Sequence, residues 1–198
     1  MSADFINNSR HPEHAVNPLI LNRWSPRALS GEAVSEGELM SLLEAAKWAP
    51  SSFNTQPWRF IYGRNGTPAW DKMFSVLAAG NKLWVKKAAV LVLILSRRNF
   101  AYNGQPNRTA SFDAGAAWEN LALEAASRGL VAHAMSGFDY DAARANFQIG
   151  EAYNIEAMIA IGRWGQKEDL PIEIQAGESP SARQPLKDII ADGEFKFE

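Results

Sequence analysis

Residues 88–95 form an uninterrupted apolar run, Ala-Ala-Val-Leu-Val-Leu-Ile-Leu. The run is far shorter than the roughly 20 residues that a membrane-spanning helix needs. Successive side chains of a strand point to opposite faces, so a strand that is apolar at every position must be covered on both faces. The run therefore predicts a central strand with helices packed on each side.

Helices that could cover such a strand are predicted both before and after it in the sequence. Ser35-Glu36-Gly37-Glu38 is a capping box, in which a hydroxyl and a carboxylate three residues apart satisfy two amides at a helix start. Apolar residues follow it at helical spacing until Pro50 ends the helix. Further helices are expected over residues 68–79 and 109–128, the second with Gly129 as its C-terminal cap.

Three more strands are predicted over residues 58–62, 130–135 and 155–161, and Asp139 is expected to cap a short helix. Helices and strands are interspersed without strict alternation. This pattern favours an α+β sandwich in which helices cover a central mixed sheet.

The sequence predicts one domain with a less regular segment at each end. We expect an N-terminal arm over residues 1–18 and a single domain over residues 19–198. Within that domain, residues 165–198 are polar and contain several prolines, and we expect them to form an extension laid over a surface.

Composition excludes several classes of function. The chain has 20 Lys and Arg against 22 Asp and Glu, a net charge of −2, which provides no field for binding nucleic acid or a membrane surface. It has no cysteine, which excludes disulfides, thiolate metal sites and cysteine nucleophiles. The polar N-terminus has no apolar run of the signal-peptide type, so we expect a cytoplasmic protein.

Common catalytic motifs are missing from the sequence. No serine lies in G-x-S-x-G, and neither a Walker loop nor a G-x-G-x-x-G fingerprint occurs. His11-Pro12-Glu13-His14 resembles a metal-binding pair only superficially, and we expect no metal site. His133 lies among apolar residues of a predicted strand, which favours a structural role.

Three polar segments remain as candidate ligand sites. Arg23-x-Ser25-x-Arg27 suits a phosphate, because arginine offers a two-pronged donor and serine a short one, although a solvated basic turn explains it equally well. Residues 49–58 are rich in hydroxyls and amides and suit the polar edge of a heterocycle, or else form an elaborate loop. In the turn over residues 135–139, Gly137 would let a backbone N–H approach a ligand closely.

Together these segments resemble the nitroreductase family of FMN enzymes. Pro50-Ser51-Ser52-Phe53-Asn54-Thr55-Gln56-Pro57-Trp58 resembles its P-S-S-x-N-x-Q-P-W signature, and Arg23-x-Ser25-x-Arg27 its phosphate motif. Ser136-Gly137-Phe138-Asp139 resembles its G-F-D turn, and Ser181-x-Arg183-x-Pro185-Leu186 its C-terminal phosphate clamp. The resemblance covers residues 19–190, with order and spacing kept.

This resemblance implies a mainly antiparallel sheet and a homodimer that binds FMN at its interface, with the C-terminal extension wrapping the partner. The phosphate and ribityl chain would be bound by Arg23, Ser25, Arg27, Ser181 and Arg183. The other subunit would contribute Pro50, Ser51, Ser52 and Asn54. The ring would be met by Ser136 and Gly137 at one edge and by Asn81 and Lys82 near the pyrimidine. Many members have lysine where Ser181 stands, and others have an acidic residue where Ser136 stands.

The implied chemistry belongs to the cofactor, since no residue need act as nucleophile or base. FMN would take a hydride from NADH or NADPH and pass electrons to a small-molecule acceptor, a nitroaromatic or a quinone, by a ping-pong mechanism. Two alternatives stay open. One is reductive dehalogenation or ene-type reduction on the same scaffold with a different lid, over residues 99–108. The other is a non-catalytic flavin-binding or structural dimer.

Overall fold

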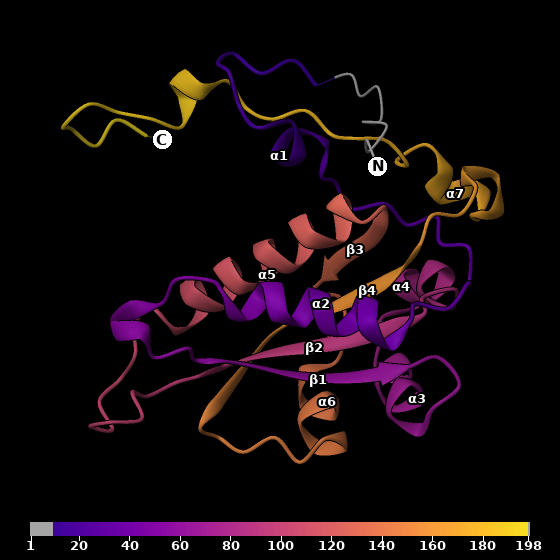
Figure 1. The fold of residues 1–198 in the computed structure, drawn as a ribbon, viewed down its shortest axis with the longest axis horizontal. Helices are drawn as coiled ribbons and strands as arrows, with labels where there is room; N and C mark the ends of the chain where they lie inside the picture. The colour runs from indigo at the N-terminus through magenta and orange to yellow at the C-terminus, as the bar shows by residue number, and fades with distance from the viewer. Residues whose placement is uncertain (1–9, 198) are drawn as a thin grey trace.

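The computed structural model describes residues 10–197, and within them four strands form one antiparallel sheet (Figure 1). The strand order is β1-β2-β4-β3. The strands are β1 (Trp58–Arg64), β2 (Val90–Arg97), β3 (Leu130–Met135) and β4 (Tyr153–Arg163). The predicted α+β architecture with a mainly antiparallel sheet is confirmed, and all three pairings are antiparallel where the sequence pattern favoured a mixed sheet.

The apolar run predicted as a central strand is β2, which lies between β1 and β4. Its side chains alternate between two hydrophobic cores, as the period of a strand requires. One core contains Leu91, Leu93 and Leu95, together with residues of α3 (Pro68–Ser75) and α4 (Ala79–Val85). The other contains Val90, Val92 and Ile94, together with residues of α2 (Glu36–Lys47) and α5 (Ala110–Ser127). Helices therefore cover both faces of the sheet.

The helix predicted over residues 68–79 is wrong at its C-terminal end, and α4 was not predicted. The helix stops at Ser75 because the next residues pair with a distant turn. Leu77 forms a bridge with Phe138, and the Ala78 amide donates to the Gly137 carbonyl at 3.0 Å. These contacts remove the backbone groups that would have continued the helix, and the chain restarts as α4.

The remaining predicted helices are present with small shifts at their ends. The capping box starts α2, and Asp139 caps α6 (Tyr140–Asn146). Gly129 follows α5 with φ +69°, the left-handed conformation expected after a helix end. A short helix that was not predicted, α1 (Pro18–Asn22), begins at the last residue of the expected N-terminal arm.

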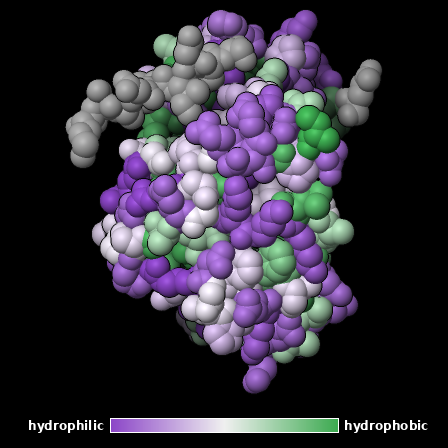
Figure 2. Space-filling view, turned by 90° about the vertical axis from the view of Figure 1, so that its right-hand side faces the viewer, coloured by the Kyte–Doolittle hydropathy of each residue, from purple (hydrophilic) through white to green (hydrophobic). Residues whose placement is uncertain are grey.

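The C-terminal extension contains α7 (Ile172–Gln175) and two short 3₁₀ helices, η2 (Lys167–Asp169) and η3 (Leu186–Asp188). In Figure 1 the gold segment that leads from α7 to η3 runs beside the described part of the N-terminal arm, in indigo. Seen from the side of α3, α4 and α7, the surface is mainly hydrophilic with scattered apolar side chains (Figure 2). No helix in residues 10–197 is long and apolar enough to span a membrane.

Candidate functional site

Arg23, which directly follows α1, lies with its side chain mostly buried against α5. Its Nε lies 3.2 Å from Oε1 of Glu119, and its Nη1 lies 3.5 Å from the Ser25 hydroxyl. The contact with Glu119 is Coulombic only, because it lies outside hydrogen-bond geometry and leaves Nε without an acceptor in the described structure. Arg23 therefore keeps a buried N–H donor beside the predicted phosphate motif.

The two predicted phosphate motifs, 158 residues apart at Arg23 and Ser181, are brought together by a residue that the sequence did not point to. Arg10 donates from Nη1 to the Arg23 carbonyl at 2.8 Å and from Nε to the Ser181 carbonyl at 2.9 Å. Arg183 donates to the Ser181 hydroxyl at 3.0 Å. Burial, followed by the charges of Arg183 and Arg23, lowers the pKa of Arg10. Three guanidinium groups thus gather in one place, an arrangement that suits an anion.

Arg27 is held at its backbone rather than through its guanidinium. The amides of Arg27 and Ala28 both donate to Oε1 of Glu178 at 2.8 Å. Glu178 belongs to the C-terminal extension, 151 residues further along the chain. No local pattern marked Glu178, and its role becomes visible only in the folded chain.

His133 has the structural role that its sequence context predicts. Its Nδ1 lies 2.9 Å from the Pro26 carbonyl, and its ring lies 4.6 Å from that of Trp84 in α4. A carbonyl only accepts, so Nδ1 carries the proton in this contact. Burial lowers the pKa of His133, which favours the neutral ring. Through His133, the 23–27 segment, β3 and α4 meet at one place.

The turn after β3 contacts α4 closely. Nδ2 of Asn81 donates to the Gly137 carbonyl at 2.9 Å. A Cβ atom on Gly137 would lie 2.7 Å from that nitrogen, so this close approach requires glycine. Ser136, at the start of the turn, is exposed. The predicted residues Asn81, Ser136 and Gly137 therefore lie together.

Lys82 does not turn its side chain toward this group. Its Nζ donates to the Ser75 carbonyl at 2.8 Å and lies 5.9 Å from the centre of the Phe74 ring. The ammonium group thus caps the end of α3.

The loop over residues 50–54 has a strained backbone. It contains the 3₁₀ helix η1 (Ser52–Asn54), in which Phe53 and Asn54 have φ of 51° and 53°. Such conformations are costly for residues other than glycine and persist where the surroundings impose them. Here the Ser52 amide donates to Asp113, a carboxylate only 3% exposed at the start of α5. Asp113 was not predicted as part of the site.

The topology separates this loop from the Asn81–Gly137 contact. The loop leads into the start of β1, whereas Gly137 follows the end of β3. In the strand order β1-β2-β4-β3, these two strands are the opposite edges of the sheet, separated by β2 and β4. The predicted site residues of one chain therefore form two separate groups.

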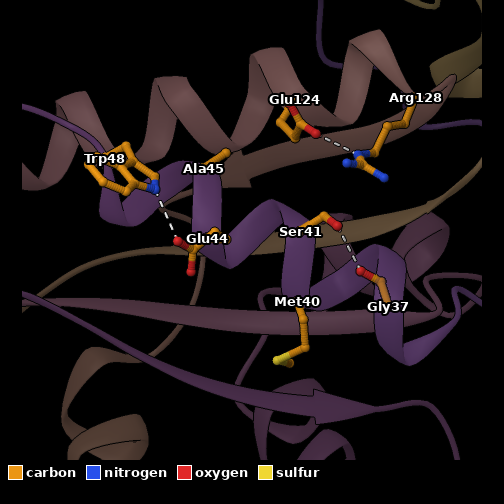
Figure 3. A pocket seen from close by; sticks show the side chains of 8 residues that line it. All are labelled: Gly37, Met40, Ser41, Glu44, Ala45, Trp48, Glu124 and Arg128. Atoms are coloured by element: carbon orange, nitrogen blue, oxygen red, sulfur yellow. Dashed lines mark hydrogen bonds and ion pairs between the residues drawn. The ribbon is translucent and has the colours of Figure 1, made fainter.

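A surface pocket of about 500 Å³ lies between α2 and α5 (Figure 3). It is lined by Gly37, Met40, Ser41, Glu44, Ala45, Trp48, Glu124 and Arg128. None of the predicted site residues lines it, so it is separate from both groups. No cluster of three or more His, Asp or Glu side chains within residues 10–197 is placed to hold a metal ion.

Comparisons with known proteins match this arrangement to one family. The sequence profile of the Nitroreductase family matches residues 20–67 and 65–163, which include the first three predicted motifs but not Ser181 and Arg183. An uncharacterised 15.4 kDa protein of Mycolicibacterium smegmatis is 34% identical over 149 residues, 69% of this chain and 97% of that protein.

Similar solved structures point to the same family. One described as an oxidoreductase containing FMN is 40% identical, with a TM-score of 0.93 over 96% of this chain and 98% of its own. A nitroreductase-type protein from Desulfovibrio desulfuricans, in complex with FMN, is 27% identical, with a TM-score of 0.74 over 92% of this chain and 100% of its own. The chain belongs to the nitroreductase family.

Proposed function

We propose that the protein is an FMN-dependent oxidoreductase that uses NADPH or NADH to reduce electron-poor acceptors such as nitroaromatics or quinones. The observation that carries this proposal is the gathering of Arg10, Arg23 and Arg183 next to two serine hydroxyls. His133 links that group to the Asn81–Gly137 contact. An anion site joined to a polar backbone turn matches the two ends of FMN.

The phosphate end would be bound by the arginines and hydroxyls. Arg23 has a buried Nε with no hydrogen-bond acceptor in the described structure, and a phosphate oxygen is a suitable one. Ser25 and Ser181 would add short donors, and Arg183 a second guanidinium. Arg27 would position the segment through the hydrogen bond that its backbone N–H donates to Glu178.

The ring end would be met by the turn after β3. Ser136 and Gly137 would present backbone groups to the N5 and O4 edge, and Asn81 holds the Gly137 carbonyl in place. Lys82 would contribute near the pyrimidine only if its side chain left the Ser75 carbonyl.

The protein would act as a homodimer in which Pro50, Ser51, Ser52 and Asn54 approach the flavin held by the other chain. The 50–54 loop and the Gly137 turn adjoin opposite edge strands of the sheet, and this supports the proposal because one chain would not bring both to one flavin.

Bound FMN would supply the redox chemistry, accepting a hydride from NAD(P)H and passing electrons to the acceptor. The side chains then need only bind, orient and exclude water, which fits a sequence without an acid–base or nucleophile motif. Donor and acceptor would use the same place in turn, giving ping-pong kinetics.

The experiment is an absorbance titration of the purified protein under anaerobic conditions. We expect a yellow protein whose flavin band is bleached by NADPH or NADH and restored by a quinone or a nitroaromatic. A yellow protein that neither nucleotide bleaches would indicate passive flavin binding, and a colourless one that takes up no FMN would refute the proposal.

Phosphate recognition is tested separately on the apoprotein. Each charge-assisted hydrogen bond is worth about 1.5–3 kcal/mol, and about 1.4 kcal/mol is a factor of ten. Riboflavin, which lacks the phosphate, should therefore bind at least about a hundredfold more weakly than FMN. Equal affinity would refute the assignment of the arginines.

A further inference from the structure

The N-terminal arm and the C-terminal extension are joined to each other at two points. Arg10 donates to the Ser181 carbonyl, and Oε1 of Glu13 accepts from the Leu186 amide at 2.8 Å. Figure 1 shows the described start of the arm beside the segment that leads from α7 to η3. Contacts between residues more than 170 positions apart show that residues 10–13 of the arm are part of the folded structure near the proposed phosphate site.

Arg10 donates hydrogen bonds to three backbone carbonyls, only one of which belongs to the extension. Its Nη1 donates to the carbonyls of Leu21 and Arg23 at 2.9 and 2.8 Å, while its Nε reaches Ser181. The guanidinium is planar and holds its N–H groups at fixed angles, so it sets the carbonyls relative to one another. Two of these carbonyls belong to residues of the proposed phosphate site, Arg23 and Ser181.

We propose that Arg10 is a positioning residue for the phosphate of the cofactor, acting through the backbone of Arg23 and Ser181. It joins the two halves of the phosphate site, which the chain supplies from opposite ends of the domain. This proposal rests on the proposed function, since it assigns a role within the same site.

The geometry favours positioning over direct binding. Nη1 and Nε of Arg10 already donate to backbone carbonyls. The Arg23 guanidinium, by contrast, keeps its Nε without a hydrogen-bond acceptor, and Arg183 reaches the Ser181 hydroxyl. Arg10 therefore holds the backbone from which the binding groups project.

The test compares FMN and riboflavin binding to the apoproteins of the wild type, Arg10→Gln and Arg10→Lys. We expect Arg10→Gln to weaken FMN binding about tenfold or more, because the phosphate contacts lose their alignment. Riboflavin, which has no phosphate, should change by less than about twofold on the same reasoning. Arg10→Lys should behave like Arg10→Gln, because a single ammonium cannot bridge the carbonyls as a guanidinium does.

Arg144 supplies a matched control. It also donates to three backbone carbonyls, those of Ile149, Gly150 and Tyr153, but it lies in α6, outside the proposed site. Arg144→Gln should therefore leave the ratio of FMN to riboflavin affinity unchanged. A thermal unfolding curve for each variant checks that the fold is kept.

A second measurement follows the extension itself. Amide hydrogen exchange over residues 181–186 in the FMN-loaded protein should be faster in Arg10→Gln than in the wild type, because the extension loses its link to the arm. Unchanged exchange would refute the link.

The binding outcomes separate the two proposals. A wild type that prefers FMN, with a preference that survives in Arg10→Gln, would refute the Arg10 proposal alone. Wild-type FMN affinity in Arg10→Lys would also refute it, since charge without positioning would then suffice. A wild type that binds both flavins equally would refute the phosphate site itself, and the Arg10 proposal with it.

Discussion

Single side chains organise this site mainly by binding backbone groups. Glu178 holds the amide of Arg27, Asp113 that of Ser52, and Arg10 the carbonyls of Arg23 and Ser181. Many family members have lysine where Ser181 stands, so the resemblance alone implies a phosphate clamp with one positive charge fewer. Arg10 brings a guanidinium to that same residue, so positive charge is present there from another part of the chain.

Gly137 gives a prediction at this scale. In Gly137→Ala the new Cβ would collide with the end of the Asn81 side chain, which is free to move aside at the cost of its bond to the Gly137 carbonyl. The displacement is confined to a side-chain end, so the fold should survive. Affinity for FMN should fall by about tenfold, which corresponds to the loss of about one hydrogen bond between the turn and the flavin.

The measurement is FMN titration of the apoprotein together with thermal unfolding. Gly150→Ala is the control, because a Cβ there meets nothing within 4 Å. Wild-type FMN affinity in Gly137→Ala would contradict a role for this turn in binding the ring.

Among the elements, α2 shows how a local signal is reinforced by a distant contact. The Glu38 carboxylate accepts from the amide and hydroxyl of Ser35, both at 2.8 Å, and also from Nη2 of Arg163 at the end of β4. The Ser35 amide, then its hydroxyl and then Arg163 lower the pKa of Glu38 to about 2. The cap therefore fixes the start of α2 against the sheet.

Glu38→Gln should consequently destabilise the protein in a pH-dependent way. The folded pKa lies below the ordinary value of 4.5, so the stabilisation is complete above about pH 4.5 and is lost as the pH falls toward 2. At pH 7 we expect a loss of about 1–2 kcal/mol in the free energy of unfolding, as for other helix caps. The difference from the wild type should shrink at pH 3.

Urea unfolding at pH 7, 5 and 3, at one protein concentration, measures this difference. Glu173→Gln, which removes an exposed carboxylate of α7, is the control for losing a negative charge. A Glu38→Gln difference of the same size at every pH would argue against the ionised cap.

The elements also show how far the sequence could predict the structure. The apolar run of β2, the capping box of α2 and Gly129 after α5 are local signals, and each was predicted. The break between α3 and α4 was missed, because it depends on Leu77 pairing with Phe138, about 60 residues away. The roles of Arg10, Asp113 and Glu178 were not predicted for the same reason, since their contacts join distant segments.

At the scale of the whole molecule, the separation of the 50–54 loop from the Asn81–Gly137 contact bears on how many chains form one site. The 50–54 loop is held by buried Asp113 in a strained, exposed conformation at one end of the sheet. The Asn81–Gly137 contact lies next to the end of β3, the edge strand opposite β1. Strain that is kept in an exposed loop indicates a function for that loop. In the proposed homodimer, each loop would complete the site of the other chain.

Such a dimer should bury more than about 2,000 Å² of surface, the range of obligate dimers. A site shared between two chains predicts that activity returns when two inactive variants form a heterodimer. Arg23→Ala removes the phosphate contact of a chain, and Asn54→Ala removes the loop contact that the chain offers to its partner. In a heterodimer of the two, one site carries both lesions and the other carries none. After complete exchange of an equal mixture, about half of the dimers are heterodimers, so about a quarter of wild-type activity should return.

The control mixes Arg23→Ala with Ser25→Ala, whose lesions belong to the same side of the site. Every site in that heterodimer keeps one lesion, so its activity should stay at the level of the single variants. Subunit exchange is verified by giving the two variants different tags and isolating dimers that carry both. If the Arg23→Ala and Asn54→Ala mixture then stays as inactive as this control, each site belongs to a single chain and the shared site is refuted.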